Sequence, residues 1–147
     1  APIVEGIYMG YKFYETAAEE GLIDYSATVQ YPFGYGLSYT TFAQEITDLQ
    51  RNGDNVTVTV KVTNTGDVAG KDAVELYYTP PYTNGGIEKA SVNLIDFEKT
   101  EMLQPGASQT VTFTVPADAP EGVTGCLQPF VRYAVGTTWF DGFLLEE

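Results

Sequence analysis

The sequence predicts an all-β fold, an antiparallel β-sandwich that is preceded by a short helix and an extended aromatic linker. After residue 42, apolar and polar residues alternate in several short segments, which is typical of strands that bury one face and expose the other. Clusters of glycine, proline and asparagine separate these segments, and no helical periodicity appears among them. Short strands joined by turns favour two packed antiparallel sheets.

A helix is predicted near the start of the chain, over Tyr8–Glu20. Apolar residues recur there every three or four positions and therefore share one stripe of the helix. They are Ile7, Tyr11, Tyr14 and Ala18. Gly21 is a typical residue to end the helix, whereas Gly6 and Gly10 weaken its beginning. Because the segment is too short to cover its own aromatic side chains, we expect it to pack on another surface.

The next distinctive segment is Tyr31–Thr40, with the sequence YPFGYGLSYT. Pro32, Gly34 and Gly36 exclude both a regular helix and a central strand. Large apolar side chains occupy the alternate positions Tyr31, Phe33, Tyr35, Leu37 and Tyr39. We therefore predict that this segment, called the connector below, runs extended between the helix and the sandwich.

The clearest strand lies around residues 56–62, where valines alternate with threonine and lysine. A turn at Asn64–Asp67 precedes a second strand, which Pro80 ends. A third strand is predicted at Asn93–Lys99 and a fourth around residues 110–115, after a turn at Pro105-Gly106. The stretch Leu127–Leu145 is rich in aromatic and β-branched residues and is expected to hold two more strands, divided near residue 136.

Period-two burial predicts one shared core and a solvent-facing outer surface. The predicted core residues include Val58, Val60, Leu76, Phe113 and Val115. The predicted outward-facing residues include Thr57, Thr59, Thr112 and Thr114.

Charge and residue usage exclude several classes of function. The 147 residues suffice for one domain, and they carry 20 acidic residues against 7 basic ones, a net charge of −13. Such a polyanion repels nucleic acid and anionic membranes, so we expect neither as a partner.

The absence of histidine excludes the serine or cysteine triads and most zinc sites. The compartment stays open, although the single cysteine, Cys126, favours a reducing one such as the cytoplasm.

Two groups of motifs resemble one enzyme family. EGIYMGYKFYET (Glu5–Thr16) followed by YPFGYGLSYTTF (Tyr31–Phe42) is similar to a junction in glycoside hydrolase family 3, where an α/β-sandwich domain ends and a C-terminal fibronectin type III-like domain begins. The body of that domain resembles VTVKVTNTGDVAGKDAVELYYTPP (Val58–Pro81) and FEKTEMLQPGASQTVTFTV (Phe97–Val115). The likeness covers most of residues 3–116.

The resemblance implies the C-terminal part of a β-glucosidase-like glycosidase of carbohydrate metabolism. Residues 1–41 would be the tail of the α/β-sandwich domain plus the linker, and residues 42–147 the fibronectin type III-like domain. In this family the nucleophilic aspartate and the acid/base glutamate lie upstream of these motifs, so no catalytic residue is assigned to this chain. No cofactor-binding or metal-binding residue is assigned either. Turn formation explains Asn64, Asp67 and Asp72 without a bound ion.

Two tyrosines are the candidate contact residues for substrate or glycan. Tyr82 lies in the predicted loop Pro80–Lys89, and the loops of a sandwich cluster at its ends, where they can border a substrate entrance. Tyr35 lies in the connector, and sugar rings stack on flat aromatic faces. Ordinary loop packing and an interdomain contact are the competing structural interpretations of these residues.

Three functions follow from these observations. The first is a non-catalytic accessory module that stabilises a family 3 glycoside hydrolase and borders its substrate entrance. The second is an independent carbohydrate-binding module, and the third a small structural or interaction domain. The expected partners are the catalytic region of the parent enzyme, or a second copy of this chain bound through Tyr8–Tyr39, together with an oligosaccharide.

Overall fold

The computed structural model describes residues 6–80, 82–116 and 128–131. In this part of the chain the elements follow in the order α1 (Tyr11–Glu19), α2 (Tyr25–Thr28), β1 (Phe42–Asn52), β2 (Asn55–Asn64), β3 (Ala73–Thr79), β4 (Asn93–Lys99), β5 (Ser108–Pro116) and β6 (Gln128–Val131). No helix among these residues is long and apolar enough to cross a membrane.

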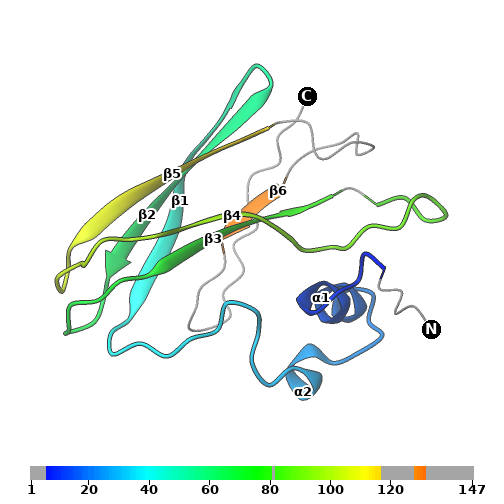
Figure 1. Ribbon diagram of the computed structural model, residues 1–147, viewed down its shortest axis with the longest axis horizontal. Helices are drawn as coiled ribbons and strands as arrows, with labels where there is room; N and C mark the ends of the chain where they lie inside the picture. Colours follow the sequence, from blue (N-terminus) through cyan, green and yellow to red (C-terminus); the bar gives the residue numbers. More distant parts are fainter. Residues whose placement is uncertain (1–5, 81, 117–127, 132–147) are drawn as a thin grey trace.

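Among the described residues the strands form two antiparallel sheets that pack face to face (Figure 1). One sheet has the order β1-β2-β5 and the other β4-β3-β6. Strand β2 is central in the first sheet, and its pairing with β5 places Val58 opposite Phe113. The predicted all-β sandwich is confirmed. Of the two strands expected in Leu127–Leu145, β6 occupies the first positions, and the rest of that stretch lies outside the described residues.

The main core lies between the two sheets, and its side chains come from alternate strand positions. The buried residues are Val56, Val58, Val60, Val62, Val74, Leu76, Leu103, Val111, Phe113 and Val115. On the opposite side of these strands, Thr112 and Thr114 are exposed. Thr57 and Thr59 are half-buried there, because β2 is the central strand of its sheet. The predicted register is therefore confirmed.

Strand β3 is buried on both faces, which strict alternation does not predict. Leu76 lies in the core between the sheets, while its neighbour Tyr77 points to the other face and is also fully buried. Tyr77 packs with Val92, Leu94 and Tyr11. Because Tyr11 belongs to α1, this helix covers part of the outer face of the β4-β3-β6 sheet (Figure 1).

Helix α1 begins three residues later than the predicted Tyr8–Glu20, at Tyr11. The reason is Gly10, whose positive φ of 54° is not helical. The helix ends as predicted, with Gly21 at a φ of 71°.

The short helix α2 was not predicted. The Asp24 carboxylate caps it by accepting a hydrogen bond from the Ala27 N–H at 3.1 Å.

The connector contains no helix or strand, as predicted, but it is not extended throughout. The Tyr35 N–H donates to the Pro32 carbonyl at 3.0 Å, and Gly34 adopts a φ of 78° to close this turn. The expectation of a continuous extended segment is therefore wrong at residues 32–35. Strand β1 begins directly after the connector, at Phe42; the division into domains at residue 41 stays a prediction.

The fully buried Asn64 joins three segments at the end of β2. Its Oδ1 accepts hydrogen bonds from the Thr40 hydroxyl at 2.8 Å and the Gly66 N–H at 3.0 Å. Its Nδ2 donates to the carbonyls of Val68 at 2.8 Å and Leu103 at 2.9 Å. The interpretation of Asn64 as a turn residue is thus correct but incomplete, because the same side chain also fixes the end of the connector.

Candidate functional site

A ring of contacts fixes the connector and α1 on the outer face of β3. Phe33 of the connector stacks on Tyr11 of α1, with ring centroids 4.4 Å apart, and Tyr11 meets Tyr77 of β3 edge to face at 6.2 Å. The Tyr77 hydroxyl donates a short hydrogen bond to Glu75. The Glu75 carboxylate in turn lies so close to Gly34 that a Cβ there would overlap it. The turn next to Phe33 therefore favours glycine through its positive φ, and a larger residue there would also displace the Glu75 carboxylate.

Polar contacts to the region before and within β4 hold α1 in the same place. The Tyr11 hydroxyl accepts a hydrogen bond from the Leu94 N–H at 2.9 Å, and the Thr16 hydroxyl accepts one from the Ser91 N–H at 3.0 Å. The Tyr25 hydroxyl of α2 donates to the largely buried Glu15 at 2.7 Å. The helix thus packs on the sandwich through Tyr11. The predicted stripe is not its buried face, because Ile7 and Tyr14 are exposed, whereas Glu15 and Ala17 are buried.

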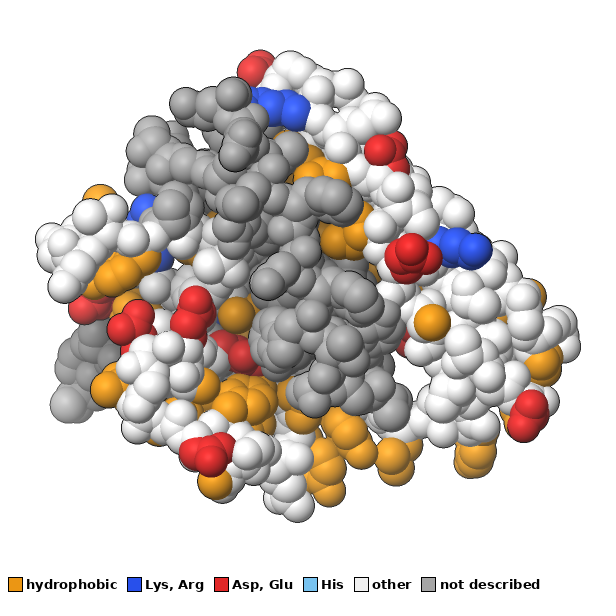
Figure 2. Space-filling view, turned by 180° about the vertical axis from the view of Figure 1, so that it is seen from behind, with side chains coloured by type: hydrophobic (Ala, Val, Ile, Leu, Met, Phe, Trp, Pro, Cys, Tyr) orange, Lys and Arg blue, Asp and Glu red, His pale blue; other side chains and the backbone are white. Residues whose placement is uncertain are grey.

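The other side of α1 and the connector remains exposed and apolar. We call this the aromatic surface, and its members are Ile7, Met9, Phe13, Tyr14, Tyr31, Phe33, Tyr35, Leu37 and Tyr39. Leu37 and Tyr39 are the extreme cases, at 91% and 97% exposure. Figure 2 shows hydrophobic side chains along the lower edge of the molecule, where α1, α2 and the connector lie. Soluble monomers rarely leave so many large apolar side chains together in contact with water.

The two tyrosines predicted as contact residues lie in different places. Tyr35 belongs to the aromatic surface, where its ring packs against that of Tyr31 at 4.9 Å, with 35° between the planes. Tyr82 lies in the loop between β3 and β4 and is half-exposed. In the described part of the chain no ring contact joins Tyr35 to Tyr82, so they do not form one site.

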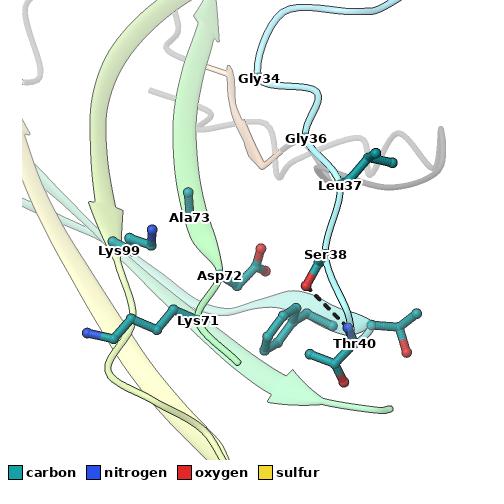
Figure 3. A pocket seen from close by; sticks show the side chains of 11 residues that line it. Gly34, Gly36, Leu37, Ser38, Thr40, Lys71, Asp72, Ala73 and Lys99 are labelled. Atoms are coloured by element: carbon teal, nitrogen blue, oxygen red, sulfur yellow. Dashed lines mark hydrogen bonds between the residues drawn. The ribbon is translucent and has the colours of Figure 1, made fainter. Parts of the chain in front are cut away.

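A pocket of about 200 Å³ lies between the connector and the adjoining ends of β3 and β4. Its lining includes Ser38 and Thr40 of the connector, Lys71 and Asp72 just before β3, and Lys99 at the end of β4 (Figure 3). The strongly exposed Leu37 also lines it, so the pocket adjoins the aromatic surface.

Asp72 is the buried charge of this pocket, with 8% of its surface exposed. Its Oδ2 accepts a hydrogen bond from the Gln44 amide at 2.7 Å. Burial raises the pKa of Asp72 above its ordinary value of 3.8, and the hydrogen bonds from Gln44 and the Ala73 N–H offset this only in part. In the described part of the chain Lys71 pairs with Glu101 at 3.7 Å, and no ion pair joins Asp72 to Lys71 or Lys99.

Comparisons with known proteins agree with this architecture. A model of the fibronectin type III-like domain matches residues 72–121. A β-glucosidase of Ruminococcus albus is 37% identical over 144 residues, which cover 94% of this chain and 14% of that protein. β-Glucosidase A of Butyrivibrio fibrisolvens is 39% identical over 128 residues, with 76% of this chain and 14% of that protein covered.

Solved structures give the same result. The β-glucosidase of Kluyveromyces marxianus in complex with glucose superposes with a TM-score of 0.74 at 30% identity, over 96% of this chain and 17% of that one. β-Glucosidase 3B of Thermotoga neapolitana in complex with glucose gives 0.68 at 33% identity, over 86% and 17%. The chain thus carries a fibronectin type III-like β-sandwich. Over most of its length it is related to the family 3 β-glucosidases, as its motifs predicted, and it spans 14% of the length of each of the two curated relatives.

Sequence reasoning found the aromatic surface but not the Asp72 pocket. The alternating aromatic residues of the connector were a direct signal, because no short segment can bury so many rings by itself. Asp72 gave no such signal: it follows a glycine-containing turn, and turn residues are usually solvated. Only the fold brings β3, β4 and the connector around its carboxylate.

Proposed function

We propose that this chain is the non-catalytic accessory module of a family 3 glycoside hydrolase of the β-glucosidase type, and that it braces the catalytic region through the aromatic surface. The observation that carries the proposal is the contrast between the two sides of α1. One side is held on the sandwich through Tyr11, and the opposite side presents the half-exposed ring of Phe13. A side that is rigidly held and apolar is suited to bind another protein surface.

The lengths of the relatives support the catalytic region as the partner of this surface. Each of the two curated relatives is a β-glucosidase of which this chain matches 14%, so the matched region is followed or preceded by much more polypeptide in those proteins. We therefore take the aromatic surface to pack on the catalytic region. We further propose that Tyr82, half-exposed in the loop between β3 and β4, borders the substrate entrance, where an oligosaccharide would pass.

The chain by itself is expected to hydrolyse no β-glucoside. In the resembled family both catalytic carboxyl groups belong to regions outside the motifs found here, and a retaining glycosidase needs the pair. The measurement is release of the chromophore from an aryl β-glucoside by the purified chain, compared with a buffer control. Turnover above the control that disappears when an acidic residue of this chain is neutralised would contradict the assignment.

The bracing role is tested in a chimera, in which this chain replaces the matching region of the Ruminococcus albus β-glucosidase. We expect Phe13→Ser to lower the temperature at which the chimera loses half of its activity, because it removes a ring from the buried contact. The isolated chain should change by no more than about 0.5 kcal/mol in stability, since Phe13 is 49% exposed there.

The matched control is Phe97→Ser, which changes an equally large ring that is 68% exposed on β4 and outside the aromatic surface. It should leave the heat resistance of the chimera unchanged. Equal effects of Phe13→Ser on chimera and isolated chain would refute the bracing role. Sedimentation of the isolated chain adds a further check, because an uncovered aromatic surface should promote self-association at micromolar concentration.

A further inference from the structure

We propose that the Asp72 pocket is a socket for a cationic side chain, arginine or lysine, of the catalytic region. The inference deepens the proposed function, on which it rests, by naming the charge chemistry of one contact. It begins with the state of the carboxylate: Asp72 is 8% exposed, and in the described part of the chain no cation pairs with it.

A buried carboxylate without a cation is unfavourable. Removing an ionised group from water costs several kcal/mol unless charge pairing and hydrogen bonds compensate. A carboxylate has about four acceptor positions, and Asp72 uses them for the Gln44 amide and the Ala73 N–H. Acceptor capacity is therefore left over, and it faces the pocket.

Among the described residues, neither neighbouring lysine pairs with Asp72. Lys71 extends away from the Asp72 carboxylate in Figure 3 and pairs with Glu101. Lys99 lies opposite Ala73 in the β3–β4 ladder and forms no ion pair with Asp72 in the described part of the chain. The carboxylate instead points into the space between β3 and the connector (Figure 3).

The size and position of the pocket fit a side chain from outside. Its volume of about 200 Å³ exceeds that of a single water, which takes about 30 Å³ in the liquid. Leu37 lines the pocket, and Tyr39 follows two residues later in the connector. These are the two most exposed residues of the aromatic surface. A partner that covers this surface therefore reaches the pocket as well. A guanidinium has the best geometry for the occupant, because its planar fork pairs with both carboxylate oxygens.

The test compares Asp72→Asn in the isolated chain and in the chimera with the Ruminococcus albus catalytic region. In the isolated chain Asp72→Asn should raise the melting temperature at pH 7, because asparagine keeps an acceptor for Gln44 and removes the unpaired charge. In the chimera it should lower the melting temperature, because the cationic side chain loses its partner. The exposed acid Asp48 on β1 provides the control, and Asp48→Asn should change the melting temperature by the same amount in both proteins.

The pH dependence of the isolated chain has a definite sign. Burial places the folded-state pKa of Asp72 above its ordinary value of 3.8, so the folded domain binds more protons than the unfolded chain between the two values. The wild-type chain therefore loses stability as the pH rises through this window. The advantage of Asp72→Asn should be largest at pH 7 and disappear below about pH 3.8, where Asp72 is protonated in both states.

An increase of melting temperature by Asp72→Asn in both proteins would overturn the socket. If Phe13→Ser still weakens the chimera in that case, the bracing role stands and only the socket is wrong. If Phe13→Ser also has no specific effect, both proposals fail. A rise in the melting temperature of the isolated wild-type chain on addition of glucose, absent in Asp72→Asn, would likewise overturn the socket and identify the pocket as a sugar site.

Discussion

Replacing Asn64 with leucine is expected to destabilise the domain by about 4 kcal/mol or more. Leucine has the same branched shape and is somewhat larger, so the loss comes from hydrogen bonds and not from a cavity. The Thr40 hydroxyl, the Gly66 N–H and the Val68 carbonyl would lose this partner, and the Leu103 carbonyl would keep only its hydrogen bond from the Gly70 N–H. A buried polar group left without a partner costs about 1–3 kcal/mol, and three groups lose the Asn64 side chain as a partner without a replacement among these hydrogen bonds. Urea unfolding followed by tryptophan or tyrosine fluorescence measures the difference.

The neighbouring residue Thr63 gives a matched control for this change. Its hydroxyl also makes a hydrogen bond, with Ser108 at 2.8 Å, but that pair is exposed to water. Thr63→Val should therefore cost less than about 1 kcal/mol. A loss below about 1 kcal/mol for Asn64→Leu would show that water replaces the asparagine amide and that Asn64 does not fix the connector.

The second large effect is expected for Phe113→Ala, at about 3–5 kcal/mol. Phe113 lies opposite Val58 in the β2–β5 ladder and is 2% exposed in the core between the sheets. Truncation leaves a cavity that the β-branched side chains around it cannot fill, because their rotamers are restricted. The free energy of unfolding is measured in the same urea titration.

The control for Phe113→Ala is its neighbour on the strand, Thr112, whose side chain is exposed. Thr112→Val should change the stability by no more than about 0.5 kcal/mol. Similar losses at Thr112 and Phe113 would contradict the alternating register of β5.

The sandwich could be predicted from the sequence because its signal is local and repeated. In β2 and β5 every second residue is a valine or phenylalanine, and the residues between them are mainly threonine, so a strand with one buried face is the only regular structure that separates the two sets. Turn residues such as Gly66 and Gly106 then fix where the strands end. Nothing in these stretches depends on distant parts of the chain.

The rest depends on contacts between segments that are far apart in sequence. Tyr77 alternates out of the sandwich core, and it is buried by Val92 and Leu94 together with Tyr11 of α1. The Glu75 carboxylate comes next to Gly34 only in the folded chain, and the connector lines the pocket around Asp72. The short helix α2 is too short for a periodic pattern, and its capping aspartate, Asp24, was the one local signal.

The docking of α1 also sets an order of events during synthesis. The hydrogen bond between Tyr11 and Leu94 joins residues that are 83 positions apart. At about 5–20 residues per second, a ribosome needs roughly 4–17 s to extend the chain from one to the other. During this interval β4 has not yet been synthesised, so α1 cannot pack against it. We therefore expect α1 to leave the ribosome before the strands of the sandwich and to reach its final place only after β4 has been made.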